Sequence, residues 1–548
     1  MRLALVCLFC VTTLHSAAAF KVTLSPLAHK GAVDGRLIVA IATNDKREPR
    51  YQVSWNLQTA QIFGVDVTAF TPDRPVLVDG AAIGHPIRSL AGLPPGKYYV
   101  QAVLNIYETV QRADGKVLKL PLDDGEGQQW NRSPGNLFSK PRLVEIAGDS
   151  VTDIELTEVI PPIEPEKDSK YLRQFRMQSD LLTRFWGRPV YISATVLVPE
   201  GFDEHPERRY PIAYRQGHFV AGFPWFRETP GPAGDRFAES AHRLYQDWTS
   251  GRLPKMLIVS TQHATPYYDD SYGVNSANTG PYGDALMKEF YPALEKQFRA
   301  IGEPWARVVY GGSTGGWMTL AQQIFYPEFF GGAWGFCPDP VDFHAFQTIN
   351  VYSDSSAYYD IGPFARQPKL LGRQPDDRVL ATMESFSQQE AVLGSKGRSG
   401  GQLDAFHATF GPVGPEGYPA KLWDSETGVI DPQVARYWTE QYDLTAILKR
   451  DWERLGPKLV GKLHVTMGTK DTFFLDAAAK RMEEFLESTR LPRKGPYYGG
   501  TFDYGNNEPH CWTGSIPAGQ SRESFYLPVF AEHMRKMAPQ GADLQSWK

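Results

Sequence analysis

A glycine-rich pentapeptide between two apolar segments places the strongest constraint on this chain. Gly311-Gly312-Ser313-Thr314-Gly315 follows the apolar residues 306–310 and precedes a helix-like segment, residues 317–325. A G-x-S-x-G motif between a strand and a helix predicts a sharp turn that lifts the serine hydroxyl above the edge of a sheet. The flanking glycines permit this turn because they carry no Cβ. Ser313 is therefore our candidate nucleophile, with a purely structural glycine turn as the alternative.

A second copy of the motif tests how far the pattern alone can be trusted. Gly397-Arg398-Ser399-Gly400-Gly401 also matches, and the chain has 50 glycines among 548 residues, so a chance match to so short a motif occurs in roughly one such chain in five. No apolar run precedes this copy. Residues 394–402 are polar, glycine-rich and basic, which predicts an exposed loop. We therefore predict that Ser399 is an inert loop residue.

The N-terminal residues 1–19 have the layout of a cleavable secretory signal. Arg2 precedes an apolar stretch, residues 3–14, and Ala17-Ala18-Ala19 precedes Phe20. We expect a secreted or periplasmic protein that is cleaved near Ala19. No later segment approaches ~20 uninterrupted apolar residues, so we expect no membrane insertion. The net charge of −5 provides no basic surface for nucleic acid.

The rest of the chain predicts a small all-β domain followed by an α/β domain. Residues 20–160 show short β-type runs with turn signals, which favour a β-sandwich-like accessory domain. Residues 161–169 form a proline-rich linker. In residues 170–548 strands alternate with helices, as in a mostly parallel sheet. Residues 338–440 form a long insertion rich in Gly, Pro and aromatics, which we interpret as a cap. The role of the β-domain stays open.

A serine nucleophile needs a base that removes its proton and an acid that orients this base. Asp471 follows a strand-like run, and loops at the carboxyl ends of strands carry the sites of open α/β sheets. Asp476 is the rival acid, although its place at the start of an amphipathic segment favours a helix-capping role. His510 lies downstream in a loop-like segment. The order Ser313, Asp471, His510 is that of α/β-hydrolases, and we predict these residues as a triad.

Donors for an oxyanion come from two loops. We expect the main-chain N–H of Thr314, the residue after the nucleophile, and a second donor from Gly217 or His218, which follow a predicted strand. Three roles are open for His218. It donates only its main-chain N–H to the oxyanion, it hydrogen-bonds the substrate through its ring, or it is an ordinary loop histidine. The sequence has no H-E-x-x-H, C-x-x-C or clustered His/Asp spacing, so we expect no metal and no cofactor.

The cysteines leave two alternatives open. Cys7 and Cys10 depart with the predicted signal, so Cys337 and Cys511 remain. Cys511 directly follows His510, and Cys337 ends an apolar run that we expect to be the strand after the nucleophile helix. An oxidising compartment favours a bridge between the two residues. A pair of buried free thiols fits equally well.

Two segments resemble a known family. Asp270-Ser271-Tyr272-Gly273-Val274-Asn275-Ser276-Ala277-Asn278-Thr279-Gly280-Pro281-Tyr282-Gly283-Asp284-Ala285 and Gly311-Gly312-Ser313-Thr314-Gly315-Gly316-Trp317 resemble the esterase family of α/β-hydrolases. The family includes esterase D-like, feruloyl esterase-like and enterochelin esterase-like enzymes, and the resemblance covers roughly residues 170–548. The β-domain is similar to the accessory sandwich of siderophore esterases.

The resemblance implies an α/β-hydrolase fold and carboxylic-ester hydrolysis through an acyl-enzyme. Ser313 would attack, His510 would transfer the proton and Asp471 would orient His510. Tannase-type feruloyl esterases join a cysteine next to the serine with one next to the histidine. Here Cys511 fits, but Gly312 stands in the first position, so Cys337 would have to substitute.

The function that we predict is a secreted serine esterase. Its substrate would be a small-molecule or carbohydrate ester: an acylated carbohydrate, an aryl ester or a siderophore-like ester. One alternative is an acyltransferase of the mycolyltransferase type, which uses the same triad with an alcohol in place of water. The other is a catalytically silent glycan-binding protein. The oligomeric state is open.

Overall fold

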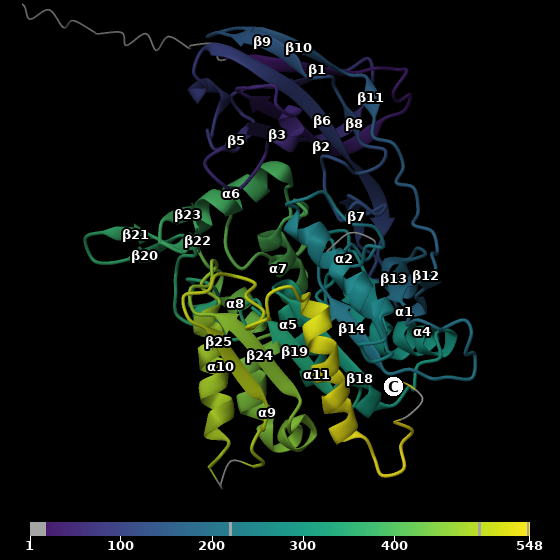
Figure 1. Ribbon diagram of the computed structural model, residues 1–548. Coiled ribbons are helices and arrows are strands. Elements are labelled where there is room, and N and C mark those ends of the chain that lie inside the picture. The colour runs from purple at the N-terminus through teal and green to yellow at the C-terminus, as the bar shows by residue number, and fades with distance from the viewer. Residues whose placement is uncertain (1–17, 219–221, 492–494, 545–546, 548) are drawn as a thin grey trace, which may run out of the picture. The chain divides into compact units, whose positions relative to one another are not determined.

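The computed structural model describes residues 18–218, 222–491, 495–544 and 547 (Figure 1). The predicted signal peptide therefore lies outside the described residues, apart from Ala18 and Ala19. The chain divides into two compact units. The first comprises the described part of Met1–Ser54 with Gln58–Ile106 and Asn136–Ile160; the second comprises Trp55–Leu57, Tyr107–Gly135 and Pro161–Lys548. Among the described residues, no helix is both long enough and apolar enough to span a bilayer.

This division corrects the prediction of one continuous β-domain over residues 20–160. Residues 107–135 belong to the second unit because their strand β7 (Val117–Leu120) buries its apolar side chains there. Leu118 and Leu120 are fully buried in a cluster that includes Trp186. The main chain of Lys119 also donates a hydrogen bond to the Tyr418 hydroxyl at 2.9 Å.

Two sheets in the first unit share one apolar core. In the smaller sheet β1 (Ala19–Leu24) lies between β10 (Val151–Leu156) and β4 (Val76–Val78). The larger sheet has the order β11 (Glu158–Val159), β8 (Leu137–Phe138), β6 (Gly96–Gln111), β2 (Val33–Ala42), β3 (Gln61–Phe70) and β5 (Ile83–His85), with β9 (Arg142–Ile146) also paired to β6. The far end of β6, residues 108–111, belongs to the second unit and pairs there with β7. Phe20 and Val22 from the first sheet pack in the same cluster as Leu37 and Val39 from the second.

An eight-stranded sheet forms the centre of the second unit. Its order is β12 (Leu172–Gln178), β13 (Tyr191–Leu197), β15 (Leu257–Gln262), β14 (Ile212–Gln216), β18 (Arg307–Gly312), β19 (Gly332–Phe336), β24 (Leu463–Gly468) and β25 (Thr501–Gly505). The strands β12, β13 and β15 are antiparallel neighbours. From β15 to β25 all neighbours are parallel. The carboxyl ends of these parallel strands meet at one edge, where ligand sites of such sheets lie.

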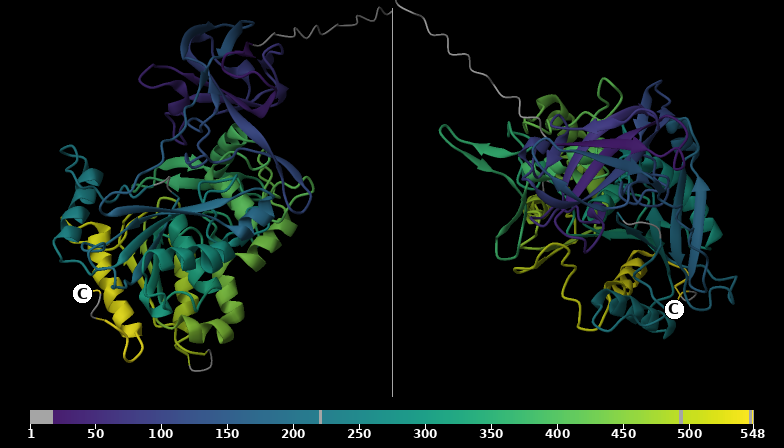
Figure 2. Two further views of the ribbon diagram at one scale, coloured as in Figure 1. Left: turned by 90° about the vertical axis from the view of Figure 1, so that its right-hand side faces the viewer. Right: turned by 90° about the horizontal axis from the view of Figure 1, so that it is seen from above.

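Apolar cores cover both faces of this sheet. Val308 and Tyr310 of β18 belong to one core, and Val309 between them belongs to the other. On the Tyr310 side, α2 (Arg236–Thr249) and α11 (Arg522–Met537) pack against each other (Figures 1 and 2). On the Val309 side lies α4 (Tyr291–Gln297). Burial on both faces explains why the central strands are apolar without alternation.

The predicted insertion contains its own elements but shares the core of the second unit. It comprises β20 (Tyr359–Ile361), β21 (Arg366–Pro368), β22 (Leu370–Arg373), β23 (Val379–Thr382), α6 (Met383–Leu393), α7 (Gln402–Phe410) and α8 (Pro432–Gln441). The hairpin β20–β21 projects from the unit in Figure 1. Phe343, Phe406 and Trp438 join the main core. The insertion is therefore an integral part of the unit.

Candidate active site

Ser313 occupies a strained turn between β18 and α5 (Thr314–Phe325). Its φ of 58° and ψ of −124° are costly for a residue with a Cβ and persist only where the surroundings enforce them. The neighbouring glycines are required by close packing. A Cβ on Gly311 would lie 2.6 Å from the Gln216 oxygen, and one on Gly315 would lie 2.3 Å from the same atom. The half-buried Ser313 is thus presented at the carboxyl end of the central strand.

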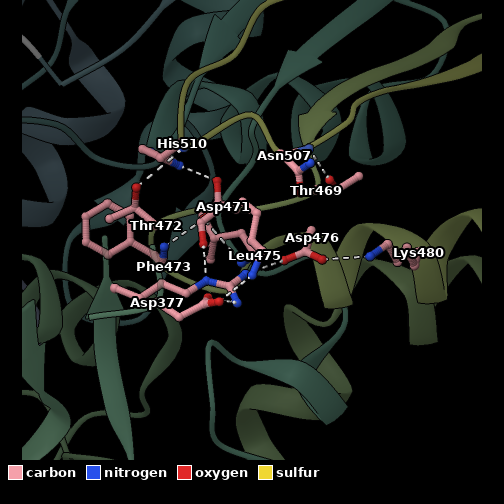
Figure 3. A network of polar contacts seen from close by, with 12 residues as sticks. Asp377, Thr469, Asp471, Thr472, Phe473, Leu475, Asp476, Lys480, Asn507 and His510 are labelled. Atoms are coloured by element: carbon pink, nitrogen blue, oxygen red, sulfur yellow. Dashed lines mark hydrogen bonds and ion pairs between the residues drawn. The ribbon is translucent and has the colours of Figure 1, made fainter. Parts of the chain in front are cut away.

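The structure brings Ser313, His510 and Asp471 into one hydrogen-bonded chain. Nε2 of His510 lies 3.0 Å from Ser313 Oγ, and Nδ1 of the same ring lies 2.7 Å from Asp471 Oδ2. Asp471 is fully buried, and the His510 side chain is 13% exposed. Figure 3 shows Asp471 pointing toward His510 from the loop after β24. A base can therefore take the Ser313 proton while a carboxylate fixes its tautomer.

The main chain of its own loop holds Asp471 in place. Asp471 Oδ1 accepts hydrogen bonds from the N–H groups of Phe473 at 2.8 Å and Leu475 at 3.3 Å. The Phe473 ring packs edge-on against the His510 ring, with centroids 4.9 Å apart. At Gly468 a Cβ would meet the Glu508 oxygen at 2.3 Å, so a glycine at the end of β24 lets the histidine loop approach.

The rival acid Asp476 lies elsewhere. It is the first residue of α10 (Asp476–Ser488), and its Oδ2 accepts a hydrogen bond from Lys480 at 2.7 Å (Figure 3). Its other oxygen lies 3.7 Å from Arg373. A carboxylate in the first turn of a helix interacts favourably with the helix dipole. Asp471, and not Asp476, is the carboxylate hydrogen-bonded to His510.

The surroundings of His510 favour its protonated form. Burial alone would lower the pKa of the imidazole, but the hydrogen bond to Asp471 and the adjacent Cys511 outweigh burial and raise the pKa to about 10. With both cysteines as thiols, the pKa of Cys511 falls to about 5, chiefly because of its hydrogen bond with Cys337 and also because of His510. The ionic state of the base therefore depends on the chemical state of the neighbouring sulfur.

The predicted oxyanion donors surround the turn. Thr314 begins α5, and N–H groups in the first turn of a helix have no acceptor within that helix. The N atom of Gly217 would lie 3.0 Å from a Cβ on Gly315, so its loop lies against the turn. The His218 ring lies 3.5 Å from an Asp269 oxygen. Burial opposes protonation of this ring, but the nearby aspartates outweigh it and raise the pKa of His218 to about 9.

Cys337 and Cys511 are neighbours in space. Both are free thiols, with Sγ atoms 3.1 Å apart. Cys337 is buried at the end of β19, and its Sγ lies 3.9 Å from the position that a Cβ on Gly312 would take. Tannase-type feruloyl esterases have a cysteine immediately before the serine, where this chain has Gly312. The Cys337 sulfur, which follows the neighbouring strand β19, lies on that side of the turn instead.

The prediction that Ser399 lies in an exposed loop is wrong. Ser399 is 4% exposed, and its hydroxyl lies 3.4 Å from a Glu390 oxygen. Burial arises because Arg398 donates a hydrogen bond to the Lys119 main chain at 2.9 Å and stacks on Tyr107, so residues 107–135 cover this loop. The segment nevertheless follows α6 rather than a strand, as a nucleophile turn would require.

Ligand-type side chains gather at two places among the described residues. These groups are Cys337, His510 and Cys511, and Asp342, His344 and Asp443. The first group contains the histidine that contacts Ser313. In the second, Asp342 already has two cations nearby: Arg481 donates a hydrogen bond to it at 3.1 Å, and Lys449 lies 3.9 Å away.

Sequence reasoning did not find Asp339 or Arg373. Asp339 follows β19, so its place after a parallel strand was an available signal. Its carboxylate accepts a hydrogen bond from Thr314 Oγ1 at 3.0 Å. Arg373 comes from β22 of the insertion and donates to the main-chain oxygen of Asp471 at 3.2 Å. No local pattern marks Arg373.

The sheet order and the placing of serine, acid and histidine after β18, β24 and β25 define an α/β-hydrolase arrangement.

No protein-family profile matches the chain, and no curated protein matches its sequence. Solved structures do match. A ferulic acid esterase aligns at 14% identity over 67% of this chain and 98% of its own, with a TM-score of 0.34. An S-formylglutathione hydrolase from Agrobacterium tumefaciens aligns at 13% identity over 68% and 99%, with a TM-score of 0.34. An IroE-like serine hydrolase from Shewanella oneidensis aligns at 11% identity over 67% and 79%, with a TM-score of 0.30.

Proposed function

We propose that this chain is a serine carboxylic-ester hydrolase that works through Ser313, His510 and Asp471. One observation carries the proposal: Ser313 Oγ lies 3.0 Å from the ring of a histidine whose other nitrogen bonds to a buried carboxylate at 2.7 Å. A serine hydroxyl is a weak nucleophile until a base removes its proton. The strained turn at Ser313 supports the same role, because strain of this kind gathers at functional sites.

The first half of the proposed reaction forms an acyl-enzyme. Ser313 Oγ attacks the ester carbonyl carbon as its proton moves to Nε2 of His510, and the carbonyl π electrons move onto the oxygen. The N–H groups of Thr314 and Gly217 would donate to this oxyanion. When the tetrahedral intermediate collapses, the bond to the alcohol oxygen breaks and His510 returns the proton to that oxygen. Asp471 stabilises the imidazolium between these steps.

The second half releases the acid. Water gives a proton to His510 and attacks the acyl carbon, and the bond to Ser313 Oγ breaks as the proton returns to this oxygen. We propose that the protein is exported, which rests on the signal-like pattern of residues 1–19. The substrate would be an acylated carbohydrate, an aryl ester or a siderophore-like ester, and the β-rich first unit would be an accessory domain.

Labelling with a fluorophosphonate tests this proposal directly. The mature protein is treated with the probe, and the modified peptide is located by mass spectrometry. We expect the adduct on Ser313 and none in Ser313→Ala. The matched control is Ser399→Ala, which removes the other G-x-S-x-G serine and should leave labelling and ester turnover unchanged. An adduct on Ser399, or a folded protein without any adduct, contradicts the proposal.

Acyl transfer differs only in the molecule that accepts the acyl group. Turnover of an aryl ester is therefore measured with and without an added sugar, whose hydroxyl groups can accept the acyl group. The free acid and the acylated sugar are both quantified. Free acid as the main product supports hydrolysis. Transferred ester in excess over free acid assigns the protein to the acyltransferases instead.

A further inference from the structure

Asp339 holds both sides of the peptide unit that carries the proposed oxyanion donor. Its main-chain N–H donates to the Ser313 oxygen at 3.2 Å, and its Oδ2 accepts from Thr314 Oγ1 at 3.0 Å. The Ser313 oxygen and the Thr314 N–H belong to one planar peptide. The same Ser313 oxygen also accepts from the N–H groups of Gly316 at 2.8 Å and Trp317 at 3.1 Å. A rotation of this peptide that redirects the N–H must therefore strain these bonds together with the contacts to Asp339.

Buried neighbours fix the Asp339 carboxylate in turn. The Tyr272 hydroxyl donates to the same Oδ2 at 2.8 Å. Asp339 is 6% exposed, and Tyr272 and Thr314 are fully buried. Burial raises the pKa of Asp339, although the hydrogen bonds from Tyr272 and Thr314 oppose this rise. In such surroundings hydrogen-bonded polar groups are held rigidly, because breaking one bond leaves a buried group without a partner.

The insertion completes this network. Gln402, the first residue of α7, donates a hydrogen bond from Nε2 to the Tyr272 hydroxyl. Its Oε1 accepts from the Tyr268 hydroxyl. The path from Gln402 through Tyr272 and Asp339 to Thr314 therefore joins the inserted segment to the turn at the nucleophile.

We propose that Asp339 is a positioning residue that aims the Thr314 N–H at the oxyanion. The inference rests on the proposed function, because an oxyanion forms only when Ser313 Oγ bonds to a carbonyl carbon. Donors placed before the charge develops stabilise the transition state more than the bound ester. The effect of Asp339 therefore falls on kcat rather than on KM.

The test compares three variants on an aryl ester and on a trifluoromethyl ketone, which adds to the serine as a tetrahedral analogue. Asp339→Ala should lower kcat by ~10–100-fold, somewhat less than the loss of a whole oxyanion donor. KM should stay within about twofold of the wild-type value, and ketone affinity should fall in proportion to kcat/KM. Asp339→Asn retains an acceptor for Thr314 and should recover most of the activity. Thr314→Val keeps side-chain volume but loses the hydroxyl, and should give an intermediate loss.

A buried aspartate away from the site provides the control. Asp443 accepts hydrogen bonds from the Tyr352 hydroxyl at 2.9 Å and from main-chain N–H groups, so Asp443→Ala carries a similar folding cost. An equal kcat loss in Asp443→Ala would overturn the inference, and so would a rise in KM alone. If Asp339→Ala does not fold, an unchanged kcat in Thr314→Val overturns it. Failure of the proposed function looks different: the wild type then turns over no ester and takes no label on Ser313.

Discussion

Arg373, from the inserted segment, donates a hydrogen bond to the main-chain oxygen of Asp471, 98 residues further along the chain. Its own N–H donates to the Thr472 oxygen at 2.9 Å, and its guanidinium lies over the Phe474 ring. Phe474 has a positive φ of 63°, so the acid loop is held in a conformation that it would not readily keep alone. The insertion thus stabilises the main chain of the loop that carries Asp471, the proposed acid.

We predict that Arg373→Ala lowers kcat by roughly 10–100-fold, the scale expected when a catalytic group moves by about 1 Å. KM should change little, because the Arg373 side chain bonds to the main chain of Asp471 and not to the carboxylate that faces His510. The matched control is Arg378→Ala, which removes an exposed arginine from the same hairpin. Steady-state kinetics of both variants decide the matter. Equal losses would assign Arg373 a general structural role.

Asp471 and Asp476 can be separated by isosteric changes. Asp471→Asn should lower kcat by roughly 10⁴-fold, because an amide facing Nδ1 favours the wrong histidine tautomer. Asp476→Asn should leave kcat within a few-fold, since its carboxylate pairs with Lys480. Kinetics over a range of pH give both values, because losing the Asp471 charge also lowers the pKa of His510. A larger loss in Asp476→Asn would show that the assignment of the acid is wrong.

The state of Cys337 and Cys511 should control the pH dependence of activity. A general base must be neutral, and with both cysteines reduced the pKa of His510 is raised to about 10 by its bond to Asp471 and by the Cys511 thiolate. In the reduced protein kcat/KM should therefore rise with pH up to about 10. Glutathione disulfide takes two electrons from the pair: a bond forms between the Cys337 and Cys511 sulfurs, the bond in glutathione disulfide breaks, and two reduced glutathione molecules leave. No thiolate then remains at Cys511. The inflection should then move to lower pH by about 1–3 units.

The measurement is a pH–rate profile of each form, with Ser313→Ala as the blank for spontaneous hydrolysis. Mass spectrometry before and after alkylation assigns the redox state of each sample. Identical profiles in both states would contradict the role given to Cys511. If glutathione disulfide does not join Cys337 to Cys511, the pH–rate profile of the reduced protein is the only one that can be measured.

A buried ion pair far from the site should affect stability without affecting turnover. Arg307 forms a bidentate pair with Glu295, at 2.6 and 2.8 Å, and Glu295 also accepts from the Tyr214 hydroxyl at 2.8 Å. Glu295→Gln leaves the buried guanidinium without its counter-charge. It should lower the free energy of unfolding by about 3–5 kcal/mol. Denaturant unfolding gives this value, and kcat of the folded variant should match the wild type.

Much of the site was predictable because its chemistry leaves local traces. Gly311 and Gly315 flank Ser313 since any side chain there would collide with the Gln216 oxygen, and that requirement is visible as a motif. Burial of β18 on both faces appears as an apolar run before the turn. Asp471 follows a strand-like segment and His510 lies downstream in a loop-like segment, so their order along the chain was sufficient to propose them. The strand β25 before His510 was not predicted.

The errors arose where a distant segment decides the environment of a local pattern. Ser399 was predicted to be exposed because its own neighbours are polar. It is buried because Arg398 contacts Tyr107 and Lys119, which lie nearly 300 residues earlier. For the same reason residues 107–135 were assigned to the β-domain, although β7 packs in the second unit.

By itself the sequence determined the change from strand-and-turn patterning to alternating strands and helices, the turn at Ser313 and the order of the candidate triad, since these depend on side-chain periodicity and on residues a few positions apart. Only the tertiary structure decided that Asp471 rather than Asp476 reaches His510, that Cys337 lies beside Cys511, and that Asp339 holds the Thr314 peptide. These are contacts across strands, and Ser313 and His510 alone are 197 residues apart. The order and register of β18, β19, β24 and β25 bring them together, and no segment of the chain encodes that register locally.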